Sequence, residues 1–290
     1  MNKKGLTISV IFEAESANYG EGFGNISTLK KLTRGDGKVY SYISRQALRY
    51  NMVEQLGWDN TPTSPSGSGE KTVIQFMPNA TIKDYPEIDM FGYMKTEAKK
   101  GAATRNAVAR ISNAISLESY NSDLDFLTNM GLAKRTGSDN SIAQSEVHKS
   151  YYTYTLTIDL DKVGIDGDIE ISNEEKKKRV VELLKTTEYL YRDIRGRREN
   201  LAPVFVVGGV YERKNPFFEN RIRVDKNKLD VATILDIINS DETIKQDTNV
   251  GYIENTFSNN EEIKGLNAKK VSEFFGSIIK NVEVVFSESN

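Results

Sequence analysis

The chain has 290 residues and a mass of 32.6 kDa, which is enough for a sizeable core built as one elaborated domain or two small ones. Its 38% hydrophobic and 28% charged residues are typical of a soluble globular protein, and the lack of cysteine excludes disulfides and thiolate chemistry. The apolar run at residues 6–14 is too short to cross a membrane and no cleavage site follows it, so we expect a cytoplasmic protein without membrane partners.

The chain begins with alternating apolar and polar residues at 6–13, which predicts a strand. A basic, glycine-rich segment follows at 18–51, where six lysines and arginines face two acids, a net charge of +4. The whole chain carries −2 with a pI near 5.8, unlike a generic nucleic-acid binder. The local charge nevertheless predicts that this segment binds a polyanion.

A helix is predicted over 44–57, with Ser44 as its N-cap. Its free N–H groups and the positive end of its dipole would then face the ligand of the loop. Helical spacing places Arg45 and Arg49 in the same sector as the apolar stripe that contains Leu48 and Met52. Two interpretations are open: the guanidinium groups bind phosphate, or they reach water or pair with a carboxylate.

In the next stretch, residues 61–69 have a composition typical of a flexible surface insertion. Candidate strands follow up to residue 117. Residues 95–110 form a second basic segment, with five cations against Glu97 and a net charge of +4. The alternative interpretation of the basic and acidic segments is that their charges are scattered over the solvated surface.

Residues 117–150 are polar with weak periodicity, which indicates a functional excursion or disorder. Their apolar residues either form an exposed wedge or anchor the loop to its own core: Leu124, Phe126, Leu127 and Met130.

Alternation predicts strands near 152–160 and 203–211, and a helix is predicted from a capping box at Ser172 and Glu175 to a stop at Gly196. Further helices are expected at 230–239 and 267–282, followed by a strand at 283–286. Residues 230–262 contain eight acids against Lys245, a net charge of −7. A chain with separate basic and acidic regions can bind RNA on one side and its own neighbour on another.

Several segments carry a resemblance to a known family. YISRQALRYN at 42–51, the N-x-x-G loop before it, DMFGYM at 89–94 and ARISNAISLES at 109–119 resemble the backbone subunit of type I CRISPR Cascade complexes. The resemblance is closest to the DevR-like branch associated with subtype I-B, and it extends from the first strand to about Arg223. Its most specific part is the S-x-Q-x-x-[KR] element at Ser44, Gln46 and Arg49.

The resemblance implies an α+β fold, with a modified RNA-recognition (RRM, ferredoxin-like) core and large insertions. We expect one elaborated domain over 1–290, with a finger- or web-like insertion at 58–117, a thumb-like hairpin at 117–150 and a C-terminal extension at 229–290. The resemblance also implies that many copies polymerise head to tail along CRISPR RNA and present its bases to target DNA in antiviral defence. Other Cascade subunits are expected partners.

In the family, the positions of Ser44, Gln46 and Arg49 contact guide-RNA phosphates, a contact that is blind to sequence. The predicted RNA-binding residues are Asn18, Asn25, Lys38, Ser44, Arg45, Gln46, Arg49 and Arg105. The predicted thumb residues, which would contact a neighbouring subunit, are Leu124, Phe126, Leu127 and Met130.

Enzymatic interpretations find little support. His148, the only histidine, is predicted to be structural or solvent-facing, and Asp159 and Asp161 end a strand where acids commonly start a turn. No phosphate loop, dinucleotide fingerprint or nucleophile elbow is present in the sequence. We therefore predict no catalytic residue, no metal and no cofactor.

Two alternatives remain. Backbone subunits of type III CRISPR complexes cut target RNA with an aspartate in the loop after the first strand, and Asp36 lies in the corresponding loop. A monomeric single-stranded RNA binder of the RNA-recognition type is the other, although its ribonucleoprotein motif has no match here. The ISRQALRYN and FGYM segments favour the type I branch, whose backbone subunits do not cleave.

Overall fold

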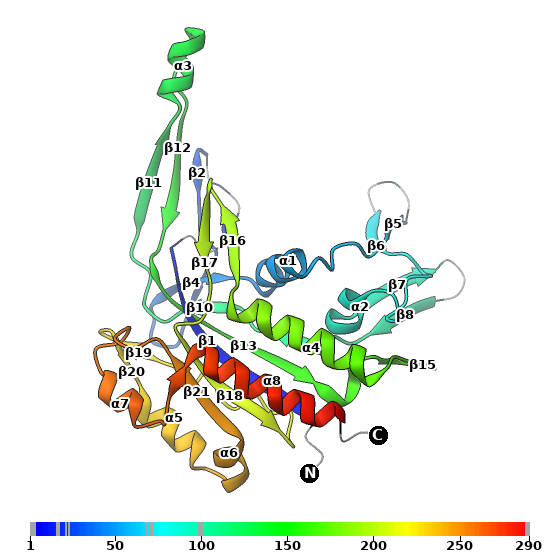
Figure 1. Cartoon of the computed structure of the whole chain (residues 1–290). Coiled ribbons are helices and arrows are strands. Elements are labelled where there is room, and N and C mark those ends of the chain that lie inside the picture. The colour runs from blue at the N-terminus through cyan, green and yellow to red at the C-terminus, as the bar shows by residue number, and fades with distance from the viewer. Residues whose placement is uncertain are drawn as a thin grey trace.

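The computed structural model describes residues 4–15, 18–20, 22, 24–67, 69, 72–97 and 101–287. Within these residues a nine-stranded sheet forms the centre of the molecule (Figure 1). Its strands lie in the order β22 (Lys269–Lys270), β21 (Thr248–Tyr252), β18 (Phe205–Tyr211), β1 (Gly5–Ala14), β13 (Ser150–Asp159), β10 (Ala114–Ser116), β4 (Val39–Ile43) and β3 (Lys31–Thr33). The ninth strand, β9 (Ala109–Ile111), pairs with β13.

Strand β1 lies between β13 and β18 and is antiparallel to both, with Ile8 opposite Leu156 and Gly208. Its side chains are buried on both faces of the sheet, because helices cover each face. The strands predicted near 6–13, 152–160 and 203–211 are confirmed, and so is the α+β fold class.

Three helices cover one face of the sheet: α1 (Arg45–Leu56), α4 (Asn173–Glu188) and α8 (Val271–Ser287) (Figure 1). In the main core, Val10 and Phe12 of β1 join the same cluster as Leu48 and Met52 of α1. The helix predicted over 44–57 is confirmed, and it ends at Gly57, which takes the left-handed conformation with φ 65°.

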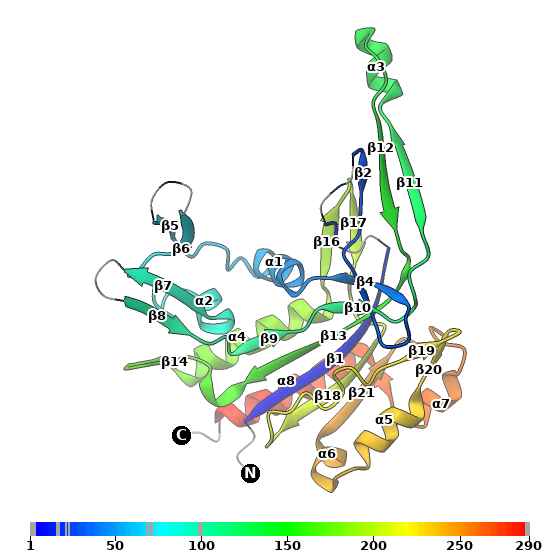
Figure 2. The same cartoon turned by 180° about the vertical axis from the view of Figure 1, so that it is seen from behind.

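A second, smaller core lies on the opposite face, under α5 (Val231–Ile238), α6 (Glu242–Asp247) and α7 (Asn260–Lys264) (Figure 2). Ile11, Phe205 and Val207 contribute to it from the sheet. The C-terminal extension is therefore part of the main architecture, since it supplies β21, β22 and α8 as well as these helices. A short hairpin, β19–β20 (Val224–Asp225, Lys228–Leu229), precedes it.

Two large projections leave the sheet on opposite sides of α1 (Figures 1 and 2). We call residues 61–106 the finger insertion; it contains β5 (Thr63–Ser66), β6 (Val73–Phe76), α2 (Pro86–Phe91), β7 (Tyr93–Glu97) and β8 (Gly101–Arg105). We call residues 118–149 the arm; β11 (Asp123–Thr128) and β12 (Ile142–Val147) form its shaft and α3 (Met130–Thr136) its tip. Strand β2 (Ile26–Ser27) pairs with β12 at its side.

Two smaller hairpins complete the described chain. A 3-10 turn (Leu160–Lys162) leads from β13 into β14–β15 (Ile165–Asp166, Ile169–Glu170). Strands β16–β17 (Tyr191–Ile194, Arg197–Asn200) form a hairpin after α4.

Two predicted boundaries are wrong. Helix α4 ends at Glu188 and not near Gly196, because residues 191–200 fold back on themselves around a two-residue turn. The strand predicted at 283–286 is instead the end of α8, since Val282 and Phe286 continue the buried stripe of that helix. The Ser172 cap is confirmed by its bond from the Glu175 N–H, whereas the Glu175 carboxylate pairs with Arg179.

The arm also decides between two interpretations. Leu124, Phe126, Leu127 and Met130 are 52%, 55%, 62% and 49% exposed, so they do not anchor the segment to the core of their own chain. The two strands and the helix of the arm are regular, so of the two interpretations of this segment, functional excursion or disorder, the structure excludes disorder for the described residues.

Candidate RNA-binding interface

The first turn of α1 is held by side chains from three loops. Asn18 Oδ1 accepts hydrogen bonds from the Ser44 N–H (3.2 Å) and from the Ser44 hydroxyl (2.7 Å). Asn113 Oδ1 accepts from the Arg45 N–H at 2.9 Å, and Ser44 Oγ accepts from the Ala47 N–H at 3.3 Å. Three of the four terminal N–H groups are therefore satisfied internally, and among described partners only the Gln46 N–H has none.

This geometry changes the expected mechanism at the helix terminus. Asn18 and Ser44 are half-buried and bind each other, so they position the helix. An anion at this end of α1 would meet few free N–H groups, and binding would depend on the cationic side chains of the first two turns.

Those side chains are exposed and share one pocket. Arg45, Gln46 and Arg49 line a hollow of about 450 Å³ together with Phe91 of α2 and Arg110 of β9. The Arg49 guanidinium lies 5.9 Å from the centre of the Phe91 ring. Neither Arg45 nor Arg49 forms an ion pair within 4.0 Å with any residue that the structure describes, although Glu87 lies near enough to feel the charge of Arg49.

Arg110 is a contributor that the predicted residue set did not include. Its guanidinium binds Asp159 Oδ2 at 3.1 Å, and the side chain remains 46% exposed at the wall of the pocket. The sequence had placed it in the basic segment 95–110, but only the pairing of β9 with β13 brings it opposite α1. The pocket therefore contains three arginines from two elements, with Arg49 and Arg110 separated by 61 residues in the sequence.

A further hollow extends from Arg49 beneath the finger insertion. It has a volume of about 860 Å³ and is lined by apolar residues that include Ile74 and Met94, which are 66% and 65% exposed. Arg49 lies at the junction of the two hollows.

The remaining predicted residues lie elsewhere. Asn25 is exposed beside the arm, where its Nδ2 lies 3.5 Å from the carbonyl of Ile142. Lys38 is exposed on the turn between β3 and β4 and does not line the pocket of Arg45 and Arg49. The structure therefore brings together Ser44, Arg45, Gln46 and Arg49, with Asn18 beneath them.

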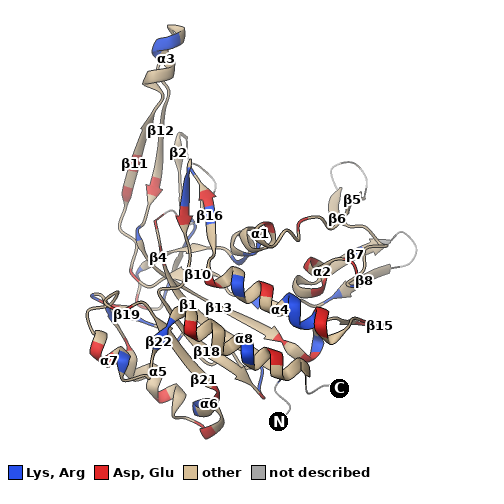
Figure 3. Ribbon diagram, viewed as in Figure 1, with Lys and Arg blue, Asp and Glu red and all other residues tan. Residues whose placement is uncertain are grey.

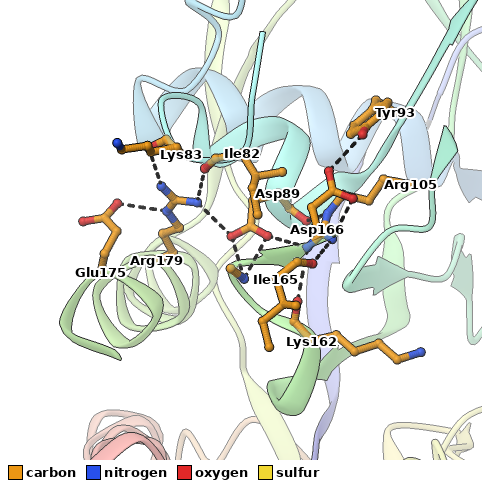
Figure 4. Close-up of polar contacts among 11 residues, drawn as sticks. Ile82, Lys83, Asp89, Tyr93, Arg105, Lys162, Ile165, Asp166, Glu175 and Arg179 are labelled. Atoms are coloured by element: carbon orange, nitrogen blue, oxygen red, sulfur yellow. Dashed lines mark hydrogen bonds and ion pairs between the residues drawn. The ribbon is translucent and has the colours of Figure 1, made fainter. Parts of the chain in front are cut away.

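Arg105 departs from the predicted set, because its side chain is only 7% exposed and its guanidinium already has partners (Figure 4). It binds Asp89 Oδ1 at 2.5 Å and donates to the carbonyls of Lys162 (3.2 Å) and Ile165. The same Asp89 carboxylate accepts from Arg179 of α4 at 2.8 Å and from the Gly164 N–H at 3.0 Å. We call this cluster the Asp89 network; it joins the finger insertion to α4 and leaves no free cation for RNA.

Lys95 is likewise buried and donates to the carbonyl of Ala80, and burial lowers the pKa of its ammonium group. Lys99 and Lys100 lie outside the described residues. The positive charge of residues 95–110 therefore marks internal contacts of the finger insertion at Lys95 and Arg105, and contributes to the pocket through Arg110.

The carboxylates considered for chemistry also have structural partners. The Asp36 carboxylate accepts from the Tyr40 hydroxyl at 2.6 Å and from the Lys38 N–H at 3.0 Å, and these bonds hold its pKa below the ordinary value. Asp159 and Asp161 pair with Arg110 and Lys214. Among the residues with assigned positions, no three His, Cys, Asp or Glu side chains cluster as a metal site.

His148 is buried at the base of the arm. Its Nδ1 lies 2.7 Å from Ser41 Oγ, and burial lowers the pKa of the imidazole. The predicted structural role is consistent with this position.

In the part of the chain that the structure describes, no helix has the length and apolar character needed to cross a membrane.

Fold and site together define an α+β scaffold with an arginine-lined pocket between two projections. A family model described as CRISPR-associated negative auto-regulator DevR/Csa2 matches residues 6–233, and the chain belongs to this family. The predicted resemblance to the DevR-like branch is confirmed. Residues 234–290 lie beyond the match.

A protein of Myxococcus xanthus (strain DK1622), described as CRISPR-associated protein Cas7/Cst2/DevR, is 29% identical over 158 residues. The match covers 49% of this chain and 52% of that protein, so the chain spans about half the length of the curated relative.

Two solved structures share the fold over nearly the whole chain. A chain of a "CRISPR RNA-guided surveillance complex, pre-nicking" gives a TM-score of 0.61 at 12% identity, covering 99% of this chain and 100% of that one. A chain of a "CRISPR RNA-guided surveillance complex" gives 0.58 at 15% identity, covering 96% and 99%. At these identities the likeness shows the fold alone.

Proposed function

We propose that this protein is a non-catalytic scaffold that binds CRISPR RNA along its phosphate backbone, and that further copies assemble head to tail on the same RNA. The guide would then pair with target DNA in antiviral defence, as one part of a ribonucleoprotein of subtype I-B that contains other Cascade subunits. Membership of the DevR/Csa2 family and the fold shared with chains of surveillance complexes support this proposal.

The exposed pair Arg45 and Arg49 is the observation on which the proposal rests. Two guanidinium groups on successive turns of α1, without acidic partners among described residues, are suited to consecutive phosphates. Gln46 adds a neutral donor between them. Because none of these groups reads a base, the contact is compatible with guides of any sequence.

The order of elements supports a modified RNA-recognition core. Strands β18, β1, β13 and β10 are adjacent and antiparallel in that order, α1 follows β1, and α4 connects β13 to β18. This is the connectivity expected of a βαββαβ unit. The finger insertion and the arm leave this unit on either side of α1 (Figures 1 and 2), so a strand bound at α1 would run between them.

The arm supports the assembly of copies. Its exposed apolar residues have no cover within the described chain, and Lys134 and Arg135 add positive charge near its tip (Figure 3). Such a surface is suited to a neighbouring subunit and to the RNA that it carries. A heterologous contact of this kind repeats along a linear ligand and ends where other subunits cap it.

The test is co-expression with a CRISPR array and the neighbouring genes, followed by purification and sequencing of bound RNA. We expect discrete spacer-containing RNAs with the wild-type chain and none with the double variant Arg45→Glu, Arg49→Glu. The matched control is Arg221→Glu, which reverses an exposed arginine away from the pocket. A folded double variant that retains its RNA would contradict the phosphate assignment.

A non-catalytic role is tested separately at Asp36. Replacement by alanine removes a carboxylate that already binds Tyr40 and Lys38, and we expect guide loading and target binding to be unchanged. Loss of target-RNA cleavage in this variant would instead support the type III alternative.

A further inference from the structure

The hairpin β16–β17 presents arginines at a tight turn. Ile194 and Arg197 form its closing pair, so Arg195 and Gly196 alone make the loop. Both residues have positive φ, 50° and 75°, as a type I′ turn requires. The sequence contains four arginines against two acids over residues 191–200, a net charge of +2.

The base of this hairpin is fixed to the body of the protein. Arg192 and Glu199, which are opposite each other in the register, form a buried ion pair at 2.6 Å. Glu199 Oε1 also accepts from the Glu15 N–H at 2.8 Å, at the end of β1. On the other side, Gln55 of α1 donates to the carbonyl of Tyr191 at 2.6 Å. The tip is therefore held at a defined place relative to α1.

Of the arginines near the tip, Arg195 is the one with its charge available. Arg197 pairs with Glu15 and Glu199, and Arg198 pairs with Asp193. Arg195 is exposed and forms no ion pair with a described residue. Its guanidinium lies over the Tyr19 ring, 4.0 Å from the ring centre, which fixes its direction.

Arginine is also an unfavourable choice for this turn. The left-handed conformation favours Gly, Asn and Asp, and a residue with a long side chain costs roughly 1 kcal/mol there. Asparagine would form the turn more readily. Because an arginine at this position lowers the stability of the turn, its presence indicates that the positive charge has a function.

Tyr19 connects this cation to the site already described. The preceding residue, Asn18, accepts the hydrogen bonds that hold Ser44 at the start of α1. The Tyr19 hydroxyl donates to the carbonyl of Glu146 at the base of the arm at 3.1 Å. The hairpin stands beside β2 and the arm in both views of the molecule (Figures 1 and 2). Arg195 is thus on the arm side of the terminus of α1.

We infer that the β16–β17 hairpin is a second phosphate-binding element, in which Arg195 contacts the backbone of the same single-stranded RNA that Arg45 and Arg49 bind. This inference rests on the proposed function and extends its contact from α1 toward the arm. A neighbouring copy, docking its acidic residues on the hairpin, is the competing occupant. The stacked, rigidly anchored guanidinium next to the terminus of α1 favours the RNA.

The test uses the full purified chain and a labelled single-stranded RNA of mixed sequence, with binding measured at several salt concentrations. Arg195→Asn removes the charge and fits the turn, so circular dichroism and the urea midpoint should be unchanged or improved. We expect about threefold to tenfold weaker binding and a salt slope shallower by about 0.7, the value for one lost phosphate contact. Arg221→Asn, at an exposed arginine outside the hairpin, should match the wild type.

The outcomes separate the inference from the proposed function. If the wild type binds and Arg195→Asn binds equally well with the same slope, the hairpin is not an RNA contact. If RNA binding is unchanged but sedimentation shows weaker self-association, the occupant is another copy and the inference is overturned. If the wild-type chain itself does not bind the RNA, the proposed function is contradicted, and the inference that rests on it falls with it.

Discussion

The finger insertion and the arm both leave the same sheet and both expose apolar side chains, yet they differ in the contacts that join them to the body. The finger insertion buries charged groups: Asp89 is fully buried between Arg105 and Arg179. The arm has no comparable buried ion-pair network among the described residues: its polar contacts are the bonds of Glu146 and His148 at its base and the pairing of β12 with β2 along its side. The difference indicates that the finger insertion is fixed to α4 by buried charges, and it agrees with the proposal that the arm contacts another molecule.

The largest expected effect tests the Asp89 network. Asp89→Asn removes the fully buried carboxylate that Arg105 and Arg179 share, and leaves them only the partly exposed Asp166 and Glu175. We expect a loss of about 3 kcal/mol in the free energy of unfolding. The measurement is urea unfolding, together with limited proteolysis of the finger insertion.

Asp166→Asn is the matched control, since Asp166 lies 3.8 Å from Arg105 but its side chain is 23% exposed. We expect a loss below about 1 kcal/mol. Equal losses in both variants would show that the network does not hold the finger insertion.

A smaller effect is expected at the base of the arm. Glu146 accepts from Lys31 Nζ at 2.7 Å and from the Leu29 N–H at 2.7 Å, and its side chain is 12% exposed. Glu146→Gln should cost about 1–3 kcal/mol. Glu13→Gln, in an exposed pair with Lys149, is the control and should change stability little.

The same carboxyl predicts a pH dependence. Burial opposes its charged form, but the bonds from Lys31 and Leu29 outweigh burial and hold the pKa of Glu146 below its ordinary value of 4.5. A lowered carboxyl pKa stabilises the fold above pH 4.5, and this contribution is lost as the pH falls through the lowered value. Glu146→Gln should reduce the dependence of the free energy of unfolding on pH in this range. An unchanged pH dependence would contradict the lowered pKa of Glu146.

His148 predicts a second pH dependence of the free energy of unfolding, at higher pH. Because burial lowers its imidazole pKa below 6.5, the unfolded chain takes up the proton first, and stability falls as the pH drops below about 6.5. Melting temperatures between pH 7.5 and 5 measure this loss, which His148→Gln should remove. As the only histidine, it also gives an unambiguous NMR titration, and an ordinary pKa there would refute the prediction.

The smallest effect on stability is expected at the exposed face of the arm. Phe126→Ser changes a side chain that is 55% exposed, so the free energy of unfolding should move by no more than about 0.5 kcal/mol. Assembly on RNA, measured by sedimentation, should nevertheless weaken. A Phe126→Ser variant that loses stability but assembles normally on RNA would show that the arm serves the stability of its own chain and not a contact with another molecule.

The sequence alone determined the features that depend on neighbouring residues. The cap at Ser44, the strand alternation in β1 and β13, the amphipathic face of α1 and the family motif at 44–49 all follow from spacing along a few turns. They predicted the α+β class and the family, which are confirmed, and the RNA contact of Arg45 and Arg49, which stays a prediction.

Tertiary structure decided which charges are free. Arg105 and Lys95 belong to a segment as basic as that of Arg45, but in the folded chain both are buried. The Asp89 carboxylate and the carbonyls of Lys162 and Ile165 bind Arg105, and the carbonyl of Ala80 binds Lys95. The turn at Arg195 was hidden within an apparent helical pattern, because β16 pairs with β17 only when the chain reverses. Charge is a local property of a sequence, whereas burial and pairing are properties of the fold, and together they determine where a polyanion can bind.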